Sequence, residues 1–305
     1  MLWSGKPYYT WNHYLREIFG EKVAKVSLDV GFTCPNRVEG RGGCIYCSPR
    51  GSGDCAGSRL LSISQQFAEQ REAIARKWPG VNKYIAYFQA YTNTLAPRED
   101  LERLYREALG QEGIVGLSIS TRPDCLPPGV LTLLEELNKE TLIWLELGLQ
   151  SSHDQTLGYI QRGHTYRQFV AAVKALQQRG IRVCAHIILG LPGEGREMMR
   201  QTARRLAELK VEGVKVHALH IVKDTKLADF YQAGLATPPT RADYITWVVD
   251  TLELLPPETV VHRLTGDAPR EILLAPKWIL EKWAVIHGIA GEFAQRNTWQ
   301  GKSYS

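Results

Sequence analysis

The sequence predicts an α/β fold, a partial (β/α)6 TIM-like barrel with a C-terminal extension. Two features of the sequence predict this fold. Short β-branched segments alternate with helical segments at intervals that suit βα units, and polar residues recur at every second position of several strands. Consecutive βα units give a parallel sheet, because right-handed crossovers return each new strand to the same sheet. An open, doubly wound sheet is the alternative that the alternation also allows.

The strands and helices are expected at regular intervals along the chain. Strands are expected at residues 23–30, 83–90, 114–121, 142–149, 181–189 and 214–221, with a weaker seventh at about 259–264. Helices are expected at residues 62–78, 97–111, 127–139, 166–179, 194–211 and 241–255. Ser62 and Thr165 each stand three residues before a glutamine, which is the spacing of a capping box, and Gly180 stands where a helix-ending glycine belongs. We expect residues 1–240 to form the barrel core with an N-terminal lead-in, and residues 241–305 to form a helical extension that completes the barrel mouth.

The alternation of polar and apolar residues favours the barrel. Buried parallel strands are usually apolar throughout, yet Ser118 and Ser120 alternate with apolar neighbours, as do Glu146, Gly148 and Gln150. One face of each strand therefore packs on helices while the other faces something polar. A lumen that holds a polar ligand fits this pattern. A hydrogen-bonded polar layer within the core is the alternative interpretation.

Composition places the chain among ordinary globular proteins. It has 305 residues, 44% of them hydrophobic and 23% charged, with a net charge of +5. No apolar run approaches the roughly 18 residues that a membrane helix needs, and the first residues lack the apolar segment of a signal peptide. We therefore expect a cytoplasmic protein with no membrane partner. The small positive charge favours an anionic partner only weakly.

Three of the six cysteines follow the first predicted strand in the pattern C-x9-C-x2-C: Cys34, Cys44 and Cys47. Barrel enzymes place their active sites at this end of the strands, and thiols in a reducing compartment favour a metal over disulfides. A zinc ribbon would close with a second cysteine pair or with histidines, which do not follow. Three ligands instead leave one iron of a four-iron cluster open to an external ligand. A structural zinc or incidental thiols are the alternative.

The remaining cysteines, Cys55, Cys125 and Cys184, contain no C-x2-C pair. A second cluster would require them to converge from separate loops or strands, so we do not expect one. Cys184 is most simply a small buried residue.

Around the cysteines, a series of short stretches in a fixed order resembles a known family: KPYY (6–9), KVSLD (25–29), QAYTNT (89–94), STRPD (120–124), ELGLQS (146–151), RGH (162–164), GLPGE (190–194) and LTGD (264–267). Together with the cysteine loop, these stretches resemble the radical S-adenosylmethionine (SAM) superfamily, in the branch of the elongator catalytic subunit. They resemble more closely a stand-alone bacterial family that is linked to maturation of the wobble uridine of tRNA.

The resemblance implies two cofactors, a [4Fe–4S] cluster on the three cysteines and SAM. It implies that the open iron binds the amine and carboxylate of SAM, and that reductive cleavage of SAM gives a 5′-deoxyadenosyl radical that abstracts a substrate hydrogen. Many members carry a Gly-Gly-Glu contact to the SAM amine where this sequence has amide and hydroxyl groups instead. The residues expected to bind the cofactor are Tyr46, Gln89, Thr92, Asn93, Ser118, Ser120, Glu146, Gln150, Leu189 and Leu191.

Other polar residues at predicted strand ends are expected to face the substrate. A single histidine on a strand is more often a core residue than a catalyst, so the convergence of several such groups matters more than any one of them. The catalytic candidates are Arg122, His186, Lys215, His217, Arg263 and Asp267. Arg122 and Arg263 are expected to grip a carboxylate, since guanidinium groups bind carboxylates through two parallel hydrogen bonds.

The resemblance implies a tRNA substrate and removal of the carboxymethyl group from 5-carboxymethylaminomethyluridine. It also implies a flavodoxin or ferredoxin as the electron donor. One alternative is radical SAM chemistry on a small metabolite or a protein side chain, and another is a non-enzymatic Fe–S or zinc module that binds RNA. Arg196, Arg200 and Arg204 recur every four residues as a basic stripe, which suits either phosphate contacts or a solvated helix face.

Overall fold

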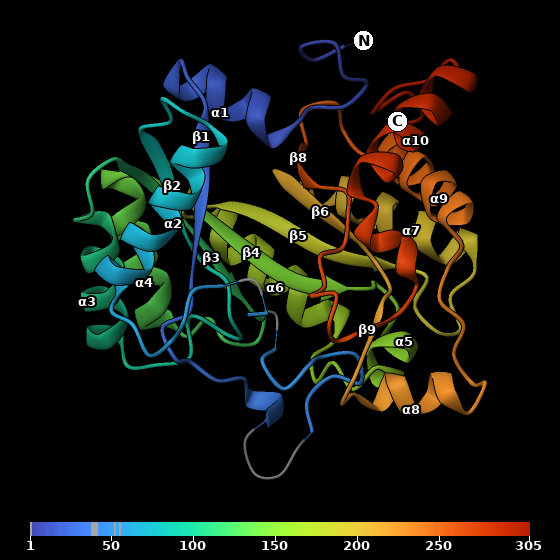
Figure 1. The fold of residues 1–305 in the computed structure, drawn as a ribbon, viewed down its shortest axis with the longest axis horizontal. Helices are drawn as coiled ribbons and strands as arrows, with labels where there is room; N and C mark the ends of the chain where they lie inside the picture. The colour runs from blue at the N-terminus through green and yellow to red at the C-terminus, as the bar shows by residue number, and fades with distance from the viewer. Residues whose placement is uncertain (1, 38–41, 52, 55) are drawn as a thin grey trace.

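One curved parallel sheet organises the molecule. The computed structural model describes residues 2–37, 42–51, 53–54 and 56–305. Its main sheet has seven parallel strands in the order β1-β2-β3-β4-β5-β6-β8. The strands are β1 (Val23–Leu28), β2 (Lys83–Phe88), β3 (Ile114–Thr121), β4 (Leu142–Gln150), β5 (Arg182–Leu189), β6 (Gly213–Ala218) and β8 (Val260–Arg263). Figure 1 shows this sheet across the middle of the molecule, with helices along its outer side. The partial barrel predicted from the sequence is confirmed.

The predicted strands are confirmed, with one correction. The weak seventh strand exists as β8 and pairs in parallel with β6. The sixth strand was predicted to reach residue 221, but β6 ends at Ala218. Ile221 and Val222 instead form β7 (Ile221–Val222), which pairs antiparallel with β9 (Leu273–Ala275). The prediction was wrong there because β-branched residues give the same sequence pattern whether they continue one strand or begin the next after a chain reversal.

The six predicted helices are present, within a few residues at each end. They are α2 (Ile63–Lys77), α3 (Arg98–Leu109), α4 (Pro128–Glu140), α6 (Tyr166–Gln177), α7 (Arg196–Glu208) and α9 (Arg241–Leu254). Both capping boxes form, since Ser62 and Thr165 each exchange hydrogen bonds with the glutamine three residues later. Gly180 has a φ of 68°, as a helix-ending glycine should.

The sequence analysis missed four helices: α1 (Trp11–Phe19), α5 (Asp154–Tyr159), α8 (Lys226–Gln232) and α10 (Lys282–Gln295). Helix α10 contains Gly288 and Gly291, which lower intrinsic helix propensity, and packing against α9 stabilises it. The two 3-10 helices are η1 (Pro35–Arg37) and η2 (Lys277–Leu280). The boundary at residue 240 stays a prediction, and β8, which lies beyond it, belongs to the same sheet as β1–β6.

The two faces of the sheet differ as the alternation predicted. Leu117, Ile119, Leu145 and Leu147 are fully buried in the main apolar core, to which residues of α3 and α4 also belong. The alternate residues turn into the concave side, where Ser118 donates to Glu146 at 2.5 Å. Among the described residues, no helix is long and apolar enough to cross a membrane.

Candidate active site

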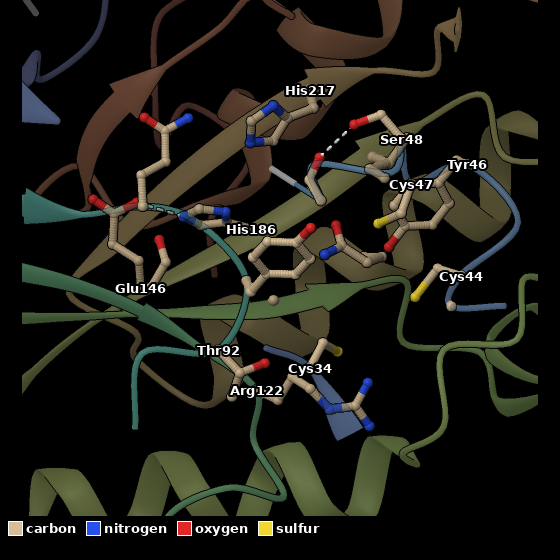
Figure 2. Close-up of a pocket in the computed structure, with 18 of the residues that line it drawn as sticks. Cys34, Cys44, Tyr46, Cys47, Ser48, Thr92, Arg122, Glu146, His186 and His217 are labelled. Carbon is tan, nitrogen blue, oxygen red and sulfur yellow. Dashed lines mark hydrogen bonds and ion pairs between the residues drawn. The ribbon is translucent and has the colours of Figure 1, made fainter. Parts of the chain in front are cut away.

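A cavity of about 220 Å³ lies at the carboxyl ends of the strands. Its walls come from the cysteine loop and from residues after or near the ends of β2 to β6 and β8, including Thr92, Gln150, Ile188 and His217. Cys34, Cys44 and Cys47 all line it. Figure 2 shows the three sulfurs on one side of this space and Glu146 and His186 on another. We call the part formed by the three cysteines the cysteine end.

The cysteine loop is fastened to the barrel by backbone hydrogen bonds at Ile45, directly after Cys44. The N–H of Ile45 donates to the carbonyl of Ile160 at 3.1 Å, and the Ile45 carbonyl accepts from Leu227 at 2.8 Å. Within the loop, the N–H of Cys47 donates to the Cys44 carbonyl at 3.0 Å. The Arg37 guanidinium donates to the carbonyls of Cys47 and Ser48. These bonds define the shape of the C-x2-C turn.

Two buried donors point at the sulfur of Cys44. The guanidinium of Arg162 lies 3.7 Å from Sγ, and the amide nitrogen of Asn36 lies 3.5 Å from it. Arg162 reaches this place because it also donates to the Gly148 carbonyl at 2.6 and 3.1 Å. A Cβ on Gly148 would lie 2.4 Å from the Arg162 guanidinium, and one on Gly163 would lie 2.2 Å from the Asn36 side-chain oxygen. Gly163 also has a φ of 76°, which favours glycine, whereas a side chain at Gly148 would displace the Arg162 guanidinium.

The chemistry of this end fits a cluster held by thiolates. A shared hydrogen bond with Cys47, together with the nearby Arg162 guanidinium, holds the pKa of the Cys44 thiol well below its usual value. Three cysteine thiols in the wall of one cavity are the kind of ligands that an iron–sulfur cluster requires.

Arg122 lies beside the cysteine end, and other groups of the protein accept hydrogen bonds from all three of its guanidinium nitrogens. Two of its nitrogens bind the carboxylate oxygens of Asp124 at 2.9 and 2.8 Å. A third donates to the carbonyl of Arg162 at 2.7 Å. Its side chain is 3% exposed. Arg122 therefore holds the loop that carries Arg162.

Glu146 forms the centre of a charged network deeper in the barrel. One carboxylate oxygen accepts from Lys25 at 2.6 Å and from Ser118 at 2.5 Å. The other oxygen lies 2.6 Å from both the Lys215 ammonium and the Nε2 of His186. Burial opposes ionisation, but Lys215 and Lys25 hold the pKa of Glu146 well below its usual value. The carboxylate is charged and fully engaged by the protein itself.

Lys215, His217 and Arg263 form a second wall of the cavity, which we call the cationic wall. Lys215 also donates to the hydroxyl of Tyr87 at 2.9 Å. Arg263 donates to Asp267 at 2.7 Å and to the Nδ1 of His217 at 3.3 Å. Burial lowers the pKa of His186 to about 4 and that of His217 well below its usual value, so both rings are neutral at pH 7.

Most of the residues predicted for the site border the cavity. Those that line it are Cys34, Cys44, Tyr46, Cys47, Gln89, Thr92, Ser120, Arg122, Glu146, Gln150, His186, Lys215, His217 and Arg263. Four cofactor candidates are not among the residues that line the cavity and instead pack or form hydrogen bonds within the protein. Asn93 binds the carbonyls of Phe88 and Ser120, Ser118 supports Glu146, and Leu189 and Leu191 are buried in apolar clusters. Asp267 pairs with Arg263. Their cofactor and catalytic roles stay predictions.

Thr92 fits a cofactor contact well. Its side-chain oxygen is buried, lies in the cavity wall, and has no hydrogen-bond partner among the described residues. A buried hydroxyl without a partner costs free energy until a ligand supplies one. Sequence reasoning overlooked Arg162 as a functional residue, although it stands in the RGH stretch, and overlooked Tyr87. The alternation of polar positions in β2 could have identified Tyr87.

The basic stripe and the remaining described cysteines lie outside this site. In the basic stripe, Arg196 and Arg200 pair with the buried Asp250, and Arg204 pairs with Glu197. Cys184 packs with Trp144 and Val260 in a small apolar cluster, and Cys125 is buried beside Asp124. Cys55 lies outside the described residues. Cys125 and Cys184 are in separate environments, and the absence of a second cluster stays a prediction.

Comparison with known proteins identifies the class that this fold and cysteine end define. Residues 30–206 match the Radical SAM superfamily, and residues 211–295 match the Radical SAM C-terminal domain. The chain therefore belongs to the radical SAM superfamily and is an enzyme that uses a [4Fe–4S] cluster and SAM. It is 47% identical to the Bacillus subtilis protein YtqA over 301 residues, which are 98% of this chain and 93% of that protein.

The chain is also similar to more distant proteins. A tRNA uridine(34) acetyltransferase from Methanocaldococcus jannaschii is 24% identical over 163 residues, 52% of this chain and 30% of that protein. The solved structure of an archaeal Elp3 from Methanocaldococcus infernus superposes with a TM-score of 0.70 at 17% identity, and covers 91% of this chain and 64% of that chain. The superposition shows that the two share a fold.

Proposed function

We propose that this radical SAM enzyme acts on the wobble uridine of tRNA and removes the carboxymethyl group of 5-carboxymethylaminomethyluridine. The observation that carries the proposal is the similarity, over half the chain, to an enzyme whose name assigns it uridine 34 of tRNA. The cavity chemistry is compatible, because the cationic wall offers donors to a carboxylate and a carbon beside an amine gives a stabilised radical.

In this proposal, different residues of the cavity bind the cluster and SAM. Cys34, Cys44 and Cys47 would bind the cluster, and Arg162 and Asn36 would donate to the sulfur of Cys44. When bound, the cluster and SAM supply a 5′-deoxyadenosyl radical for hydrogen abstraction. The hydroxyl of Thr92 and the amide of Gln150 can form hydrogen bonds with the polar groups of SAM. Tyr46 lies beside the cysteines, where its aromatic ring suits adenine (Figure 2).

The proposed partners are tRNA and a flavodoxin or ferredoxin. Arg50 is exposed between Ser48 and Gly51, which both line the cavity, and we expect it to contact the backbone of a bound RNA. Such contacts would fix the RNA at the entrance, while the modified base enters the cavity.

The test is nucleoside analysis of tRNA from a deletion strain, together with an assay of the purified enzyme. We expect the deletion strain to accumulate 5-carboxymethylaminomethyluridine, and the reduced, anaerobically reconstituted enzyme to form 5′-deoxyadenosine only when tRNA carrying that nucleoside is present. A wild-type wobble profile in the deletion strain would remove the tRNA assignment. Formation of 5′-deoxyadenosine with a small metabolite or a peptide, and not with tRNA, would replace it with the corresponding substrate class.

A further inference from the structure

The charges in the network of Glu146 and the cationic wall do not balance. Three cations, Lys25, Lys215 and Arg263, meet two carboxylates, Glu146 and Asp267. Lys282 also lies 3.9 Å from Asp267, but its side chain is 53% exposed and solvent screens its charge. The surrounding histidines do not add charge at neutral pH, because burial lowers the pKa values of His186, His217 and His262. One positive charge is therefore left in excess. Since an unbalanced charge in a region of low dielectric is costly, this excess calls for an anion.

The two lysines that share Glu146 differ in what else surrounds them. Lys25 also contacts Ser118, and its ammonium lies 4.8 Å and 4.6 Å from the ring centres of Trp11 and Tyr87. The Lys25 side chain is 20% exposed, but Lys25 is not among the described residues that line the cavity. Lys215 binds the other oxygen of Glu146 and the hydroxyl of Tyr87, and it does line the cavity. The excess charge is consequently presented to the cavity by Lys215.

The neighbours of Lys215 in the cationic wall add donors rather than acceptors. Arg263 can only donate, so the Nδ1 of His217 must accept from it, and the neutral ring carries its proton on Nε2. The Nε of Arg263 is buried with no hydrogen-bond partner among the described residues. An ammonium, an imidazole N–H and a guanidinium therefore converge on one wall of the cavity, and the carboxylate beside them is already occupied.

We propose that the cationic wall is a subsite for a single carboxylate carried by the substrate. One excess charge matches a carboxylate, whereas a terminal phosphate would bring close to two negative charges. A phosphodiester carries one charge but has chain on both sides, which does not suit a wall set deep in the barrel. The charge count does not depend on tRNA. The inference rests on the proposed function only for the identity of the molecule that carries the carboxylate.

The test measures how strongly the protein prefers a carboxylate over its neutral isostere. The probes are N-acetylglycine and N-acetylglycinamide, titrated by saturation-transfer NMR into the enzyme loaded with cluster and SAM. We expect wild-type protein to bind the acid at least about tenfold more tightly than the amide, as charge-assisted hydrogen bonds are stronger than neutral ones. In Lys215→Met this ratio should fall below about threefold while SAM affinity stays within about twofold. The control Lys226→Met removes an exposed lysine and should keep the wild-type ratio.

Two further variants keep the outcome decisive if Lys215→Met does not fold. Lys215→Arg should retain the preference, and Arg263→Met, at a side chain that is 24% exposed, should reduce it. A preference that is absent in wild type, or unchanged in both Lys215→Met and Arg263→Met, would overturn the subsite. If the acid is preferred but the deletion strain has normal wobble uridine, the subsite stands and the tRNA assignment fails.

Discussion

The cysteine end and the cationic wall both border the cavity with buried cations, but the two sets of cations differ in how completely the protein coordinates them. Arg122 and Arg162 give their donors to Asp124, to backbone carbonyls and to a cysteine sulfur. Lys215 and Arg263, together with Lys25, outnumber the two carboxylates that they share, Glu146 and Asp267. A cation whose hydrogen bonds all go to the protein holds parts of the protein in place. A cation that is in excess over the carboxylates is available to a ligand. This difference separates Arg122 from Arg263, which the sequence treats alike.

Removal of the cluster ligands should break the cysteine end completely. Cys34→Ala, Cys44→Ala and Cys47→Ala should each abolish cluster assembly, because a three-ligand site cannot spare a thiolate. The measurement is iron and sulfide content after anaerobic reconstitution. Cys125→Ala and Cys184→Ala serve as controls and should retain the wild-type iron content. Retention of a full cluster by any of these three variants would show that another residue binds the cluster.

Replacement of Arg122 should sharpen the comparison through stability. Arg122→Met leaves Asp124 and the Arg162 carbonyl without their donor, and breaking a largely buried ion pair costs about 3–5 kcal/mol. Because Asp124 is 20% exposed, we expect about 3 kcal/mol, measured by urea unfolding. Arg263→Met should cost less than about 1 kcal/mol, since its partner Asp267 is 40% exposed. Equal losses in the two variants would contradict the distinction between them.

Acidification should destabilise both regions in a window set by buried histidines. Burial lowers the pKa values of His164, behind the cysteine end, and of His186, beside Glu146 and Lys215, to about 4. The unfolded chain binds these protons below about pH 6.5 and the folded chain only below about 4. The free energy of unfolding should therefore fall as pH drops from 6.5 to 4, by up to about 1.4 kcal/mol per pH unit for each histidine.

The pH prediction is checked by denaturant unfolding at several pH values. His186→Gln and His164→Gln should each flatten the slope between pH 6.5 and 4, the first through the network of Glu146 and the second through the Gly148 carbonyl. Loss of the Glu146 charge should add to the fall only at lower pH, because its pKa is held below the usual value. A slope that neither variant changes would place the titrating groups elsewhere.

A smaller effect is expected from Thr92→Val, which removes a buried hydroxyl and keeps the shape of the side chain. The variant should weaken SAM binding by about 0.5–1.5 kcal/mol, the usual worth of one hydrogen bond. Equilibrium dialysis with the cluster-loaded protein measures the change. Thr94→Val is a matched control, since the Thr94 hydroxyl is used by Thr121 and by the Cys125 carbonyl.

The smallest effect is expected on the basic stripe of α7. Because Asp250 and Glu197 already pair with these arginines, the double variant Arg200→Glu and Arg204→Glu should change tRNA affinity by less than about twofold. Arg50→Glu, at the cavity entrance, should weaken binding more and lower its salt dependence. Filter binding at several salt concentrations compares the two. A larger loss from the α7 variant would place the RNA on that helix.

The order of the strands, the capping boxes and the cysteine triad could be predicted because they depend on neighbouring residues. Periodicity placed Ser120, Glu146 and His186 on the concave face, and spacing grouped Cys44 with Cys47. The state of each charge depends on partners far away in the chain, such as Lys25 and Lys215 on Glu146. No local pattern could show that Arg122 is saturated. Helix α10 was missed because its stability comes from packing on α9 rather than from its own residues.

The attachment of Ile45 and Cys44 has a consequence for how motion would reach the cluster. Backbone bonds link Ile45 to Ile160, which follows α5, and to Leu227 in α8, while Arg162 and Asn36 donate to the Cys44 sulfur. A displacement of either helix would therefore move a cluster ligand and the donors beside it, and hydrogen bonds to cluster sulfurs help to set the reduction potential of the cluster.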